Sequence, residues 1–308
     1  MSAITLNNIT KTYNKGTVLA VNDVSFSVEE GEIFGLIGPD GAGKSSIFRM
    51  LTTLLIPDKG DATVGGLHIV KDFKAIRGIV GYMPGRFSLY GDLTVEENLN
   101  FFATVFNTSI EENYHLIQDI YVQIEPFRHR RAGKLSGGMK QKLALCCALI
   151  HKPKVLFLDE PTTGVDVVSR KEFWEMLKRL KDQGITILVS TSYMDEATLC
   201  DRIALILDGK ILSIASPENT IKAYPEQLYA IKSDSLYRLL LDLRAYPGTI
   251  DCYTFGEFLH LSFNTTEEEV RKYLDEKGYK SVEMKKIVPT VEDCFIRLLK
   301  QRDGGNSN

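Results

Sequence analysis

The sequence lacks both an excess of basic charge and any long apolar run. It has 37 Lys and Arg against 40 Asp and Glu, a formal net charge of −3, so no global positive field is available to hold nucleic acid phosphates. Its most apolar stretches, at 155–158, 185–189 and 203–207, are much shorter than the roughly 18–20 residues of a membrane-spanning helix. We therefore expect neither a nucleic acid partner nor a transmembrane helix.

Targeting, redox and repeat signals are also scarce. The first ten residues show no charged segment followed by an apolar one, which predicts a cytoplasmic location. No internal repeat or low-complexity tract occurs, which argues against a tandem array. The cysteines form no CxxC or Cys/His spacing, so we expect reduced packing residues rather than a metal site or disulfides at Cys146, Cys147, Cys200, Cys252 and Cys294.

The length and the apolar content are sufficient for two domains, because the chain has 308 residues of which 44% are hydrophobic. Residues 1–220 alternate β-rich and helical patterns, which predicts an α/β domain with a largely parallel central sheet. Between about 92 and 150 the strands disappear and a Thr94-x-x-Glu97 capping box opens a helical pattern, which predicts an inserted helical subdomain. The expected strands are Ile4–Ile9, Ser25–Val28, Ile33–Ile37, Ile79–Met83, Val155–Leu158, Ile185–Ser190 and Ile203–Leu207.

Residues 221–308 follow a different pattern. Their order is β-α-β-β-α-β, which predicts a small ferredoxin-like α+β domain, followed by a last helix over Val291–Gln301. The segment has no metal cluster, nucleophile pair or phosphate loop, so its residues offer no chemistry of their own. We expect an accessory domain, either regulatory and dimer-stabilising or a simple stabilising cap.

A phosphate-binding loop is the strongest motif. The segment 38–45 fits G-x-x-x-x-G-K-[ST], follows the apolar strand IFGLI and precedes a helical stretch. Its glycines let backbone amides surround phosphate oxygens at a helix N-terminus, Lys44 neutralises β- and γ-phosphate charge, and Ser45 ligates Mg²⁺. We expect ATP and Mg²⁺ as cofactors, with nucleotide contacts at Gly38, Pro39, Asp40, Gly41, Ala42, Gly43, Lys44, Ser45 and Ser46.

An acidic pair ends another apolar strand. Asp159 and Glu160 follow the run VLFL, at the strand edge where open α/β sheets bind ligands. Adjacent strand residues point to opposite sides, so we expect Asp159 to ligate Mg²⁺ and Glu160 to act on the attacking water as the catalytic base, together with Lys44. An isolated Asp-Glu pair is more often a solvated strand end, but the upstream phosphate loop favours catalysis.

A third motif indicates the family. The segment LSGGMKQ, with Ser136, Gly137 and Gly138, opens the helical stretch KQKLALCCALI. Together with GPDGAGKS and LFLDEPTTGVD, in this order, it resembles the nucleotide-binding subunit of an ATP-binding-cassette (ABC) transporter, a P-loop NTPase. The run GYMP…FSLY…DLTVEENL is most similar to the drug-resistance and multidrug-export branch.

The resemblance implies a composite nucleotide site. In the family the serine-glycine turn serves the phosphate loop of a second protomer, in a head-to-tail dimer of two copies or of two related cassettes. Tyr13 matches the aromatic residue on which adenine stacks, with Val18 nearby, and Asp166 stands in the loop that makes contacts across the dimer. The alternatives from the residues alone are an ordinary surface tyrosine at Tyr13 and an ordinary turn aspartate at Asp166.

Two positions depart from the family pattern. The family has a glutamine where this chain has Gly85 and a γ-phosphate-contacting histidine where it has Ser192. Glycine supplies no ligand, and a serine hydroxyl is shorter than imidazole and uncharged. We therefore expect slow basal hydrolysis with nucleotide binding and dimer closure retained, or replacement of the sensing role by Arg86 or Tyr193.

The resemblance also implies a membrane partner. Phe87, Leu89 and Tyr90 lie in a non-periodic segment where the family receives its permease, and we expect them to form an exposed apolar surface or, alternatively, to pack in the core. The segment Pro289–Asp293 resembles a PTxED ending found on export-type ATPase subunits. The expected location is therefore cytoplasmic and peripheral, at the inner face of the membrane through the permease.

Three functions fit these features. The first is the ATP-hydrolysing subunit of an ABC exporter that powers a separately encoded permease. The others are an ATP-gated regulatory cassette with little hydrolysis and a soluble cassette ATPase that acts outside transport. The sequence reveals neither the cargo nor whether the dimer is homomeric.

Overall fold

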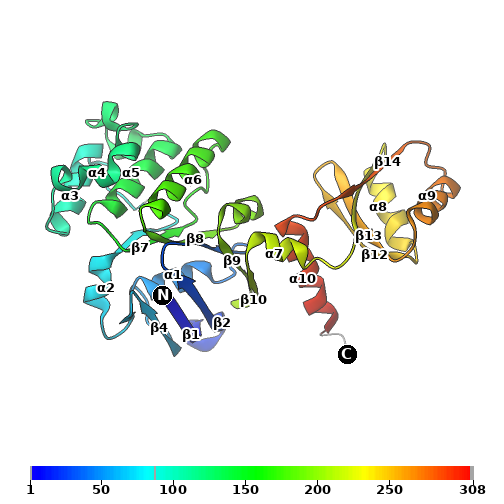
Figure 1. Ribbon diagram of the computed structural model, residues 1–308, viewed down its shortest axis with the longest axis horizontal. Coiled ribbons are helices and arrows are strands. Elements are labelled where there is room, and N and C mark those ends of the chain that lie inside the picture. The colour runs from blue at the N-terminus through cyan, green and yellow to red at the C-terminus, as the bar shows by residue number, and fades with distance from the viewer. Residues whose placement is uncertain (1, 87, 306–308) are drawn as a thin grey trace. The chain divides into compact units, whose positions relative to one another are not determined.

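The computed structural model describes residues 2–86 and 88–305. The chain forms two compact units, residues 1–217 and 218–308, and both carry helices and sheets (Figure 1). Each unit is described by itself.

A six-stranded sheet forms the centre of unit 1. Its order is β10-β9-β3-β8-β7-β6, parallel except for the edge strand β10. All residues of β3, β7 and β8 are buried, which explains why these strands read as continuous apolar runs. The expected parallel sheet is confirmed. The strands are β3 (Ile33–Ile37), β6 (Val80–Met83), β7 (Val155–Asp159), β8 (Thr186–Thr191), β9 (Arg202–Leu207) and β10 (Lys210–Ala215).

A second, antiparallel sheet was not anticipated from the sequence. The expected strands Ile4–Ile9 and Ser25–Val28 belong to it rather than to the central sheet, within the longer strands β1 (Ser2–Tyr13) and β2 (Val18–Glu29). Phe26 of this sheet stacks on Phe34 of the central sheet with 5.3 Å between ring centroids, so the two sheets share one core. The sheet is completed by β4 (Lys59–Val64) and β5 (Leu67–His68), in the order β2-β1-β4-β5.

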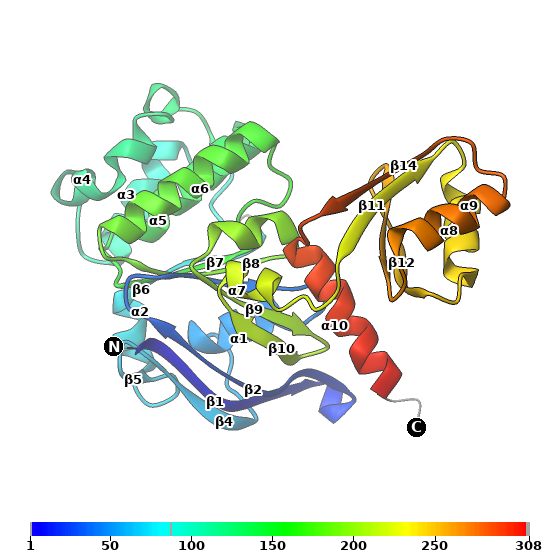
Figure 2. The same ribbon diagram turned by 45° about the vertical axis from the view of Figure 1, so that its right-hand side comes forward.

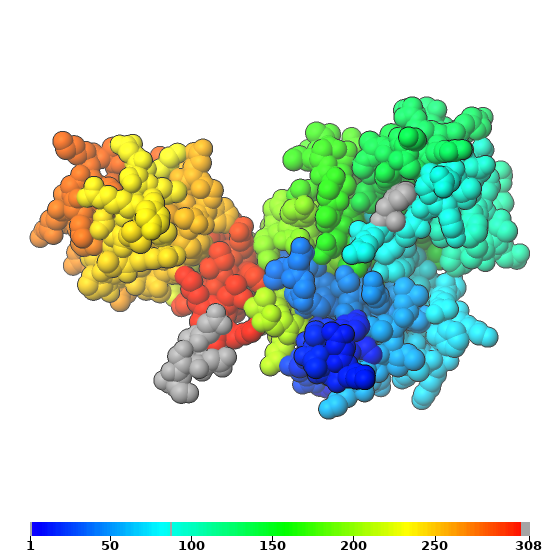
Figure 3. All heavy atoms as spheres, turned by 180° about the vertical axis from the view of Figure 1, so that it is seen from behind, coloured from blue at the N-terminus to red at the C-terminus, as the bar shows by residue number. Residues whose placement is uncertain are grey.

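Helices α3, α4 and α5 form the expected helical insertion. Thr94 caps α3 by a capping box with Glu97, as its sequence predicts. In the space-filling view these helices (green) and the N-terminal strands (blue) occupy opposite ends of unit 1 (Figure 3). The helices of unit 1 are α1 (Lys44–Leu51), α2 (Phe73–Ile79), α3 (Val95–Val105), α4 (Ile110–Tyr121), α5 (Gly137–Leu149) and α6 (Val167–Asp182).

Unit 2 has the predicted ferredoxin-like topology. Its sheet order is β12-β13-β11-β14 with all pairs antiparallel, and α8 and α9 lie side by side on one face (Figure 2). The elements are α7 (Pro217–Lys222), β11 (Leu228–Ser233), α8 (Leu236–Ala245), β12 (Thr249–Phe255), β13 (Phe258–Phe263), α9 (Glu267–Glu276), β14 (Val282–Ile287) and α10 (Val291–Gly305).

The PTxED-like segment acts as a clamp at the start of α10. Asp293 is fully buried; its Oδ2 accepts hydrogen bonds from Thr290 N at 2.6 Å and Thr290 Oγ1 at 2.7 Å. Its Oδ1 accepts from Tyr253 OH at 2.7 Å and lies 2.6 Å from His260 Nδ1. Tyr253 and His260 alternate along their strands with core residues that face α8 and α9. Asp293 therefore fastens α10 to the opposite face of the sheet.

The expected packing role of the cysteines is confirmed. All five are buried and free of disulfides. Burial raises the pKa of Cys146, Cys200 and Cys294, so their thiols stay protonated and unreactive. In the described part of the chain, no helix combines the length and apolar character that a membrane crossing requires.

Candidate functional site

The phosphate loop joins β3 to α1 and encloses a lysine. Gly43 has a positive φ of 100°, and a side chain there would collide with the carbonyl oxygen of Ala20, so this turn requires glycine. Lys44 is 3% exposed, and its Nζ donates to the carbonyl oxygens of Gly38 at 2.7 Å and Pro39 at 2.9 Å. The ammonium group is therefore folded into the loop, beside the N-terminus of α1, where an anion is favoured.

The acidic pair lies beside this lysine. Asp159 is buried at the end of β7, and Glu160 follows it, half-buried, with its Oε1 3.2 Å from Lys44 Nζ. Thr163 Oγ1 donates to the other carboxylate oxygen of Glu160 at 3.4 Å. Parallel strands carry their ligand sites at their carboxyl ends, and the structure brings the three charged groups together at this edge.

Ser190, which the sequence analysis missed, holds the acidic pair in place. Its Oγ donates to Asp159 Oδ1 at 2.6 Å and accepts from Glu160 N at 3.0 Å, while its carbonyl oxygen also accepts from Glu160 N at 3.1 Å. These bonds hold Glu160 at a φ of +50°, a conformation that ordinary side chains rarely adopt and that is common at functional sites. Ser190 reaches the acidic pair through the register of β8 against β7, and no motif in the sequence reveals that register.

A pocket of about 580 Å³ opens over these groups. Lys44, Ser45, Asp159 and Glu160 line it, and Gly85 contributes backbone only. The hydroxyl and carboxylate oxygens at Ser45 and Asp159 are ligands that Mg²⁺ prefers, and the ammonium and loop amides suit phosphate oxygens. The residues present therefore fit MgATP.

Three further side chains line the same pocket, and two were not expected there. They are Arg49, Tyr82 and Arg86, of which the sequence analysis considered Arg86 alone. Burial, together with the negative charge of Asp159, raises the pKa of Tyr82 to about 12. Tyr82 therefore remains a neutral hydroxyl that can donate a hydrogen bond into the pocket.

Tyr13 is fixed beside the first turn of α1. Its hydroxyl lies 3.0 Å from Ser46 Oγ, and Tyr13 is paired with exposed Val18 where β1 and β2 meet. The ring therefore borders the end of the phosphate loop, on an accessible surface.

The serine-glycine turn lies at a different place. Ser136 caps α5 by accepting a hydrogen bond from Met139 N at 3.3 Å, and both Ser136 and Gly137 are exposed. Gly138 packs so closely against α6 that a Cβ there would lie 2.7 Å from Ser169 Oγ.

Asp166 caps α6 next to this turn. Its Oδ1 accepts from Ser169 N at 3.0 Å, a hydrogen bond that holds the pKa of Asp166 below its usual value. None of Ser136, Gly137, Gly138, Asp166 or Ser192 is among the described residues that line the pocket. One chain therefore presents the expected nucleotide contacts as two separate groups.

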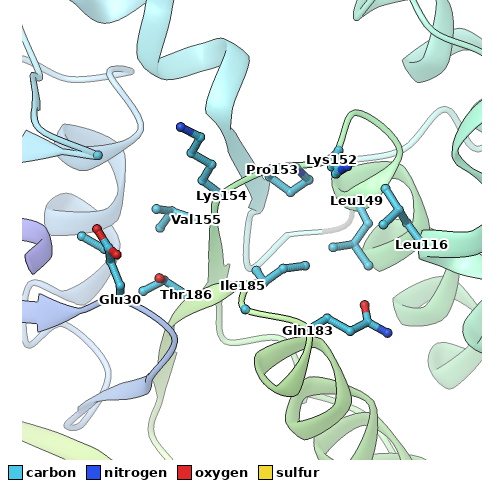
Figure 4. Close-up of a pocket in the computed structure, with 13 residues that line it drawn as sticks. Glu30, Leu116, Leu149, Lys152, Pro153, Lys154, Val155, Gln183, Ile185 and Thr186 are labelled. Carbon is cyan, nitrogen blue, oxygen red and sulfur yellow. The ribbon is translucent and has the colours of Figure 1, made fainter. Parts of the chain in front are cut away.

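A second concavity, of about 520 Å³, lies at the amino-terminal ends of β7 and β8 (Figure 4). Apolar side chains such as Leu149, Pro153 and Ile185 line it, with the polar groups of Glu30, Lys152 and Gln183 around them. It lies at the sheet edge opposite the phosphate loop, whereas open α/β sheets bind their ligands at the carboxyl edge.

Comparisons with known proteins agree with this site. A family profile described as ABC transporter matches residues 21–163. The chain is 38% identical over 304 residues to the probable multidrug ABC transporter ATP-binding protein YbhF of Escherichia coli, covering 97% of this chain and 52% of the relative. The chain thus spans about half the length of that relative.

Another relative matches along nearly its whole length. The Nod factor export ATP-binding protein I of Rhizobium sp. (strain N33) is 36% identical over 300 residues, 96% of both chains. A solved structure, the ATP-binding cassette MJ0796 in a dimeric post-hydrolysis state with ADP and Pi, superposes with a TM-score of 0.63 at 26% identity and covers 69% of this chain and 98% of that one. On this likeness and on the motifs placed above, the chain belongs to the family of ATP-binding proteins of ABC transporters.

Proposed function

We propose that this chain is the energy-coupling subunit of an ABC exporter, which binds and hydrolyses ATP as a dimer and powers a separate membrane permease. The observation that carries the proposal is the pocket at the carboxyl edge of the sheet, where Lys44 Nζ lies 3.2 Å from the Glu160 carboxylate beside Ser45 and Asp159. The names of the relatives, multidrug transport and Nod factor export, support export as the direction.

The residues of the pocket divide the chemistry. Ser45 and Asp159 would hold Mg²⁺, which supplies neutralisation of charge on the phosphate oxygens. Lys44 exchanges its two carbonyl partners for phosphate oxygens, and the loop amides bind the rest. Glu160 polarises the attacking water for in-line displacement at the γ-phosphate. Tyr13 stacks on the adenine ring.

The second group of contacts belongs to a partner cassette. Exposed Ser136 and Gly137 lie at a helix N-terminus suited to a γ-phosphate, and Asp166 lies next to them in space. Val167 and Val168, which follow Asp166, are 77% and 69% exposed and give this surface an apolar patch. A second copy, or a related cassette, covers the surface when ATP joins the two.

A groove next to the pocket suits the permease. It measures about 400 Å³ and is lined largely by apolar side chains, among them Met83, Phe102 and Val105. Of the three residues expected at this surface or in the core, Phe87 lies outside the described residues and Tyr90 is 50% exposed. Leu89 is only 9% exposed and packs into the groove wall, which fits the core alternative. Docking here would hold unit 1 at the inner face of the membrane.

A second candidate function is an ATP-gated regulator that hydrolyses slowly. The observation that favours it is that Gly85 brings no side chain into the pocket and Ser192 is not among the described lining residues. Unit 2 serves as an accessory domain in either case, with the nucleotide-binding domain in residues 1–220.

The test is to purify the chain from membranes together with any multi-span protein bound to it, and to measure the ATPase activity of that complex. We expect the two to co-purify and the complex to hydrolyse ATP, with Glu160→Gln reducing the rate by about a hundredfold. A rate of the unaltered complex no higher than that of Glu160→Gln would favour the regulator, and failure to bind ATP would contradict both functions.

A further inference from the structure

A buried polar cluster connects two segments that flank the nucleotide site. Thr162 Oγ1 donates a hydrogen bond to Glu196 Oε1 at 2.7 Å, and both side chains are buried. Arg170 of α6 approaches the same carboxylate oxygen with its Nε at 3.7 Å. The cluster therefore joins the loop after β7, the start of α6 and the segment after β8.

The cluster is incompletely bonded. Glu196 Oε2 and Arg170 Nε are buried polar atoms without a hydrogen-bond partner among the described residues, and 3.7 Å exceeds hydrogen-bond distance. Buried polar atoms are nearly always paired. The 3.7 Å between Arg170 Nε and Glu196 Oε1 leaves the pair room to close to hydrogen-bond distance.

Arg170 contacts two segments that carry residues with an expected role at the nucleotide. Arg170 lies one turn after Asp166, whose carbonyl oxygen accepts from Arg170 N at 2.9 Å. The guanidinium carbon of Arg170 also lies 4.2 Å from the centre of the Tyr193 ring. This cation–π contact connects Arg170 to the residue that follows Ser192.

The loop after β7 connects the cluster to Glu160, the proposed catalytic base. Thr162 lies in the loop that follows Glu160, and its neighbour Thr163 donates to the Glu160 carboxylate at 3.4 Å. Glu196, through Thr162, is thus linked to the loop that positions Glu160, and through Arg170 to the loop that carries Asp166.

We propose that Arg170 and Glu196 are positioning residues that make Asp166, Ser192 and the Glu160 loop move as one body, and that the pair closes to hydrogen-bond distance when a second cassette contacts Asp166. The inference rests on the proposed ATP-driven dimer. Displacements of about 1 Å at a reacting centre cost up to about a hundredfold in rate, so loss of this coupling should slow hydrolysis.

The test uses the full chain with three variants and a matched control. Glu196→Gln keeps an acceptor for Thr162 but removes the charge, Arg170→Lys keeps the charge but removes the planar group over Tyr193, and the third variant combines both. Arg179→Gln is the control, because Arg179 lies on the same helix and forms an exposed ion pair with Asp119 at 3.8 Å. Measurements are kcat, the affinity of one protomer for MgADP, and the MgATP concentration that half-dimerises each variant in a Glu160→Gln background.

We expect kcat to fall about tenfold or more and the half-dimerising MgATP concentration to rise, with the MgADP affinity and the control within about twofold of the unaltered chain. The double variant should have a kcat no lower than that of the poorer single variant, because each substitution breaks the same Arg170–Glu196 coupling. Additive losses, a parallel loss of MgADP affinity, or values equal to the control would overturn the proposal. Should Glu196→Gln not fold, Arg170→Lys alone carries the test, because that side chain is partly exposed. If Glu160→Gln alone does not dimerise with MgATP, the proposed function itself fails.

Discussion

The two units use buried charged groups in different ways. In unit 1, Lys44, Asp159 and Glu160 border a pocket of about 580 Å³. In unit 2, Asp293 and His260 are equally buried, but their partners are side chains and backbone of the same unit. A buried aspartate therefore serves ligand chemistry where it faces a cavity and folding where its partners belong to the same unit.

The largest expected effect separates chemistry from folding in unit 1. Glu160→Gln should lower kcat by about a hundredfold or more, because the amide cannot accept the proton of the attacking water. Thermal unfolding should change little, since Glu160 is partly exposed and its backbone bonds to Ser190 remain. Steady-state ATPase and melting curves check both, with Glu172→Gln, at a partly exposed ion pair with Lys142, as the control. Unchanged turnover would remove Glu160 from the chemistry.

The converse effect is expected in unit 2. Asp293→Asn should destabilise it by about 3 kcal/mol, because the substitution removes a buried carboxylate that accepts hydrogen bonds from Tyr253 and Thr290 at the start of α10. ATP affinity should not change. Hydrogen exchange of the β12 and β13 amides in urea measures this, and Glu257→Gln, at an exposed ion pair with Lys232, is the control. Equal exchange in the two variants would show that the clamp contributes nothing.

The same carboxylate predicts an acid-sensitive unit 2. Burial alone would raise the pKa of Asp293, but hydrogen bonds from His260, Thr290 and Tyr253 hold it below its ordinary 3.8. The stabilisation is therefore complete above the unfolded-state pKa and is lost as the pH falls through the lower folded-state pKa. Below about pH 4, exchange of the β12 amides should accelerate more steeply in the unaltered chain than in Asp293→Asn. Parallel pH profiles would contradict this.

The smallest effects concern the two departures from the family. Ser192→His should raise kcat by up to about tenfold, since imidazole reaches further than a hydroxyl. Gly85→Gln should gain less, because its Cβ would lie 3.0 Å from the Asp159 carbonyl oxygen and the backbone must shift. Single-turnover ATP hydrolysis distinguishes the two variants. A decrease in rate for Ser192→His would mean that the serine has a role of its own.

Features set by neighbouring residues could be predicted from the sequence, whereas features set by long-range strand pairing could not. The phosphate loop, the acidic strand end and the ferredoxin-like order are each set by neighbouring residues, and they were predicted. The antiparallel sheet was missed because the polar strand KGDATV of β4 shows little alternation and its pairing with β1 joins residues roughly fifty to sixty positions apart in the sequence.

Site residues that depend on register were missed for the same reason. Ser190 reaches Asp159 only because β8 and β7 pair in a particular register. The contact of Arg170 with Tyr193 joins α6 to the segment that follows β8. Neither pairing leaves a spacing that a reader of one sequence can recognise.

The central claim is that nucleotide joins two chains through sites that neither completes alone. Light scattering of Glu160→Gln measures this directly. The account predicts the 34.6 kDa mass of one chain without nucleotide and twice that mass with saturating MgATP, a change that the further substitution Ser136→Arg abolishes. A mass that stays at 34.6 kDa with saturating MgATP would contradict the account.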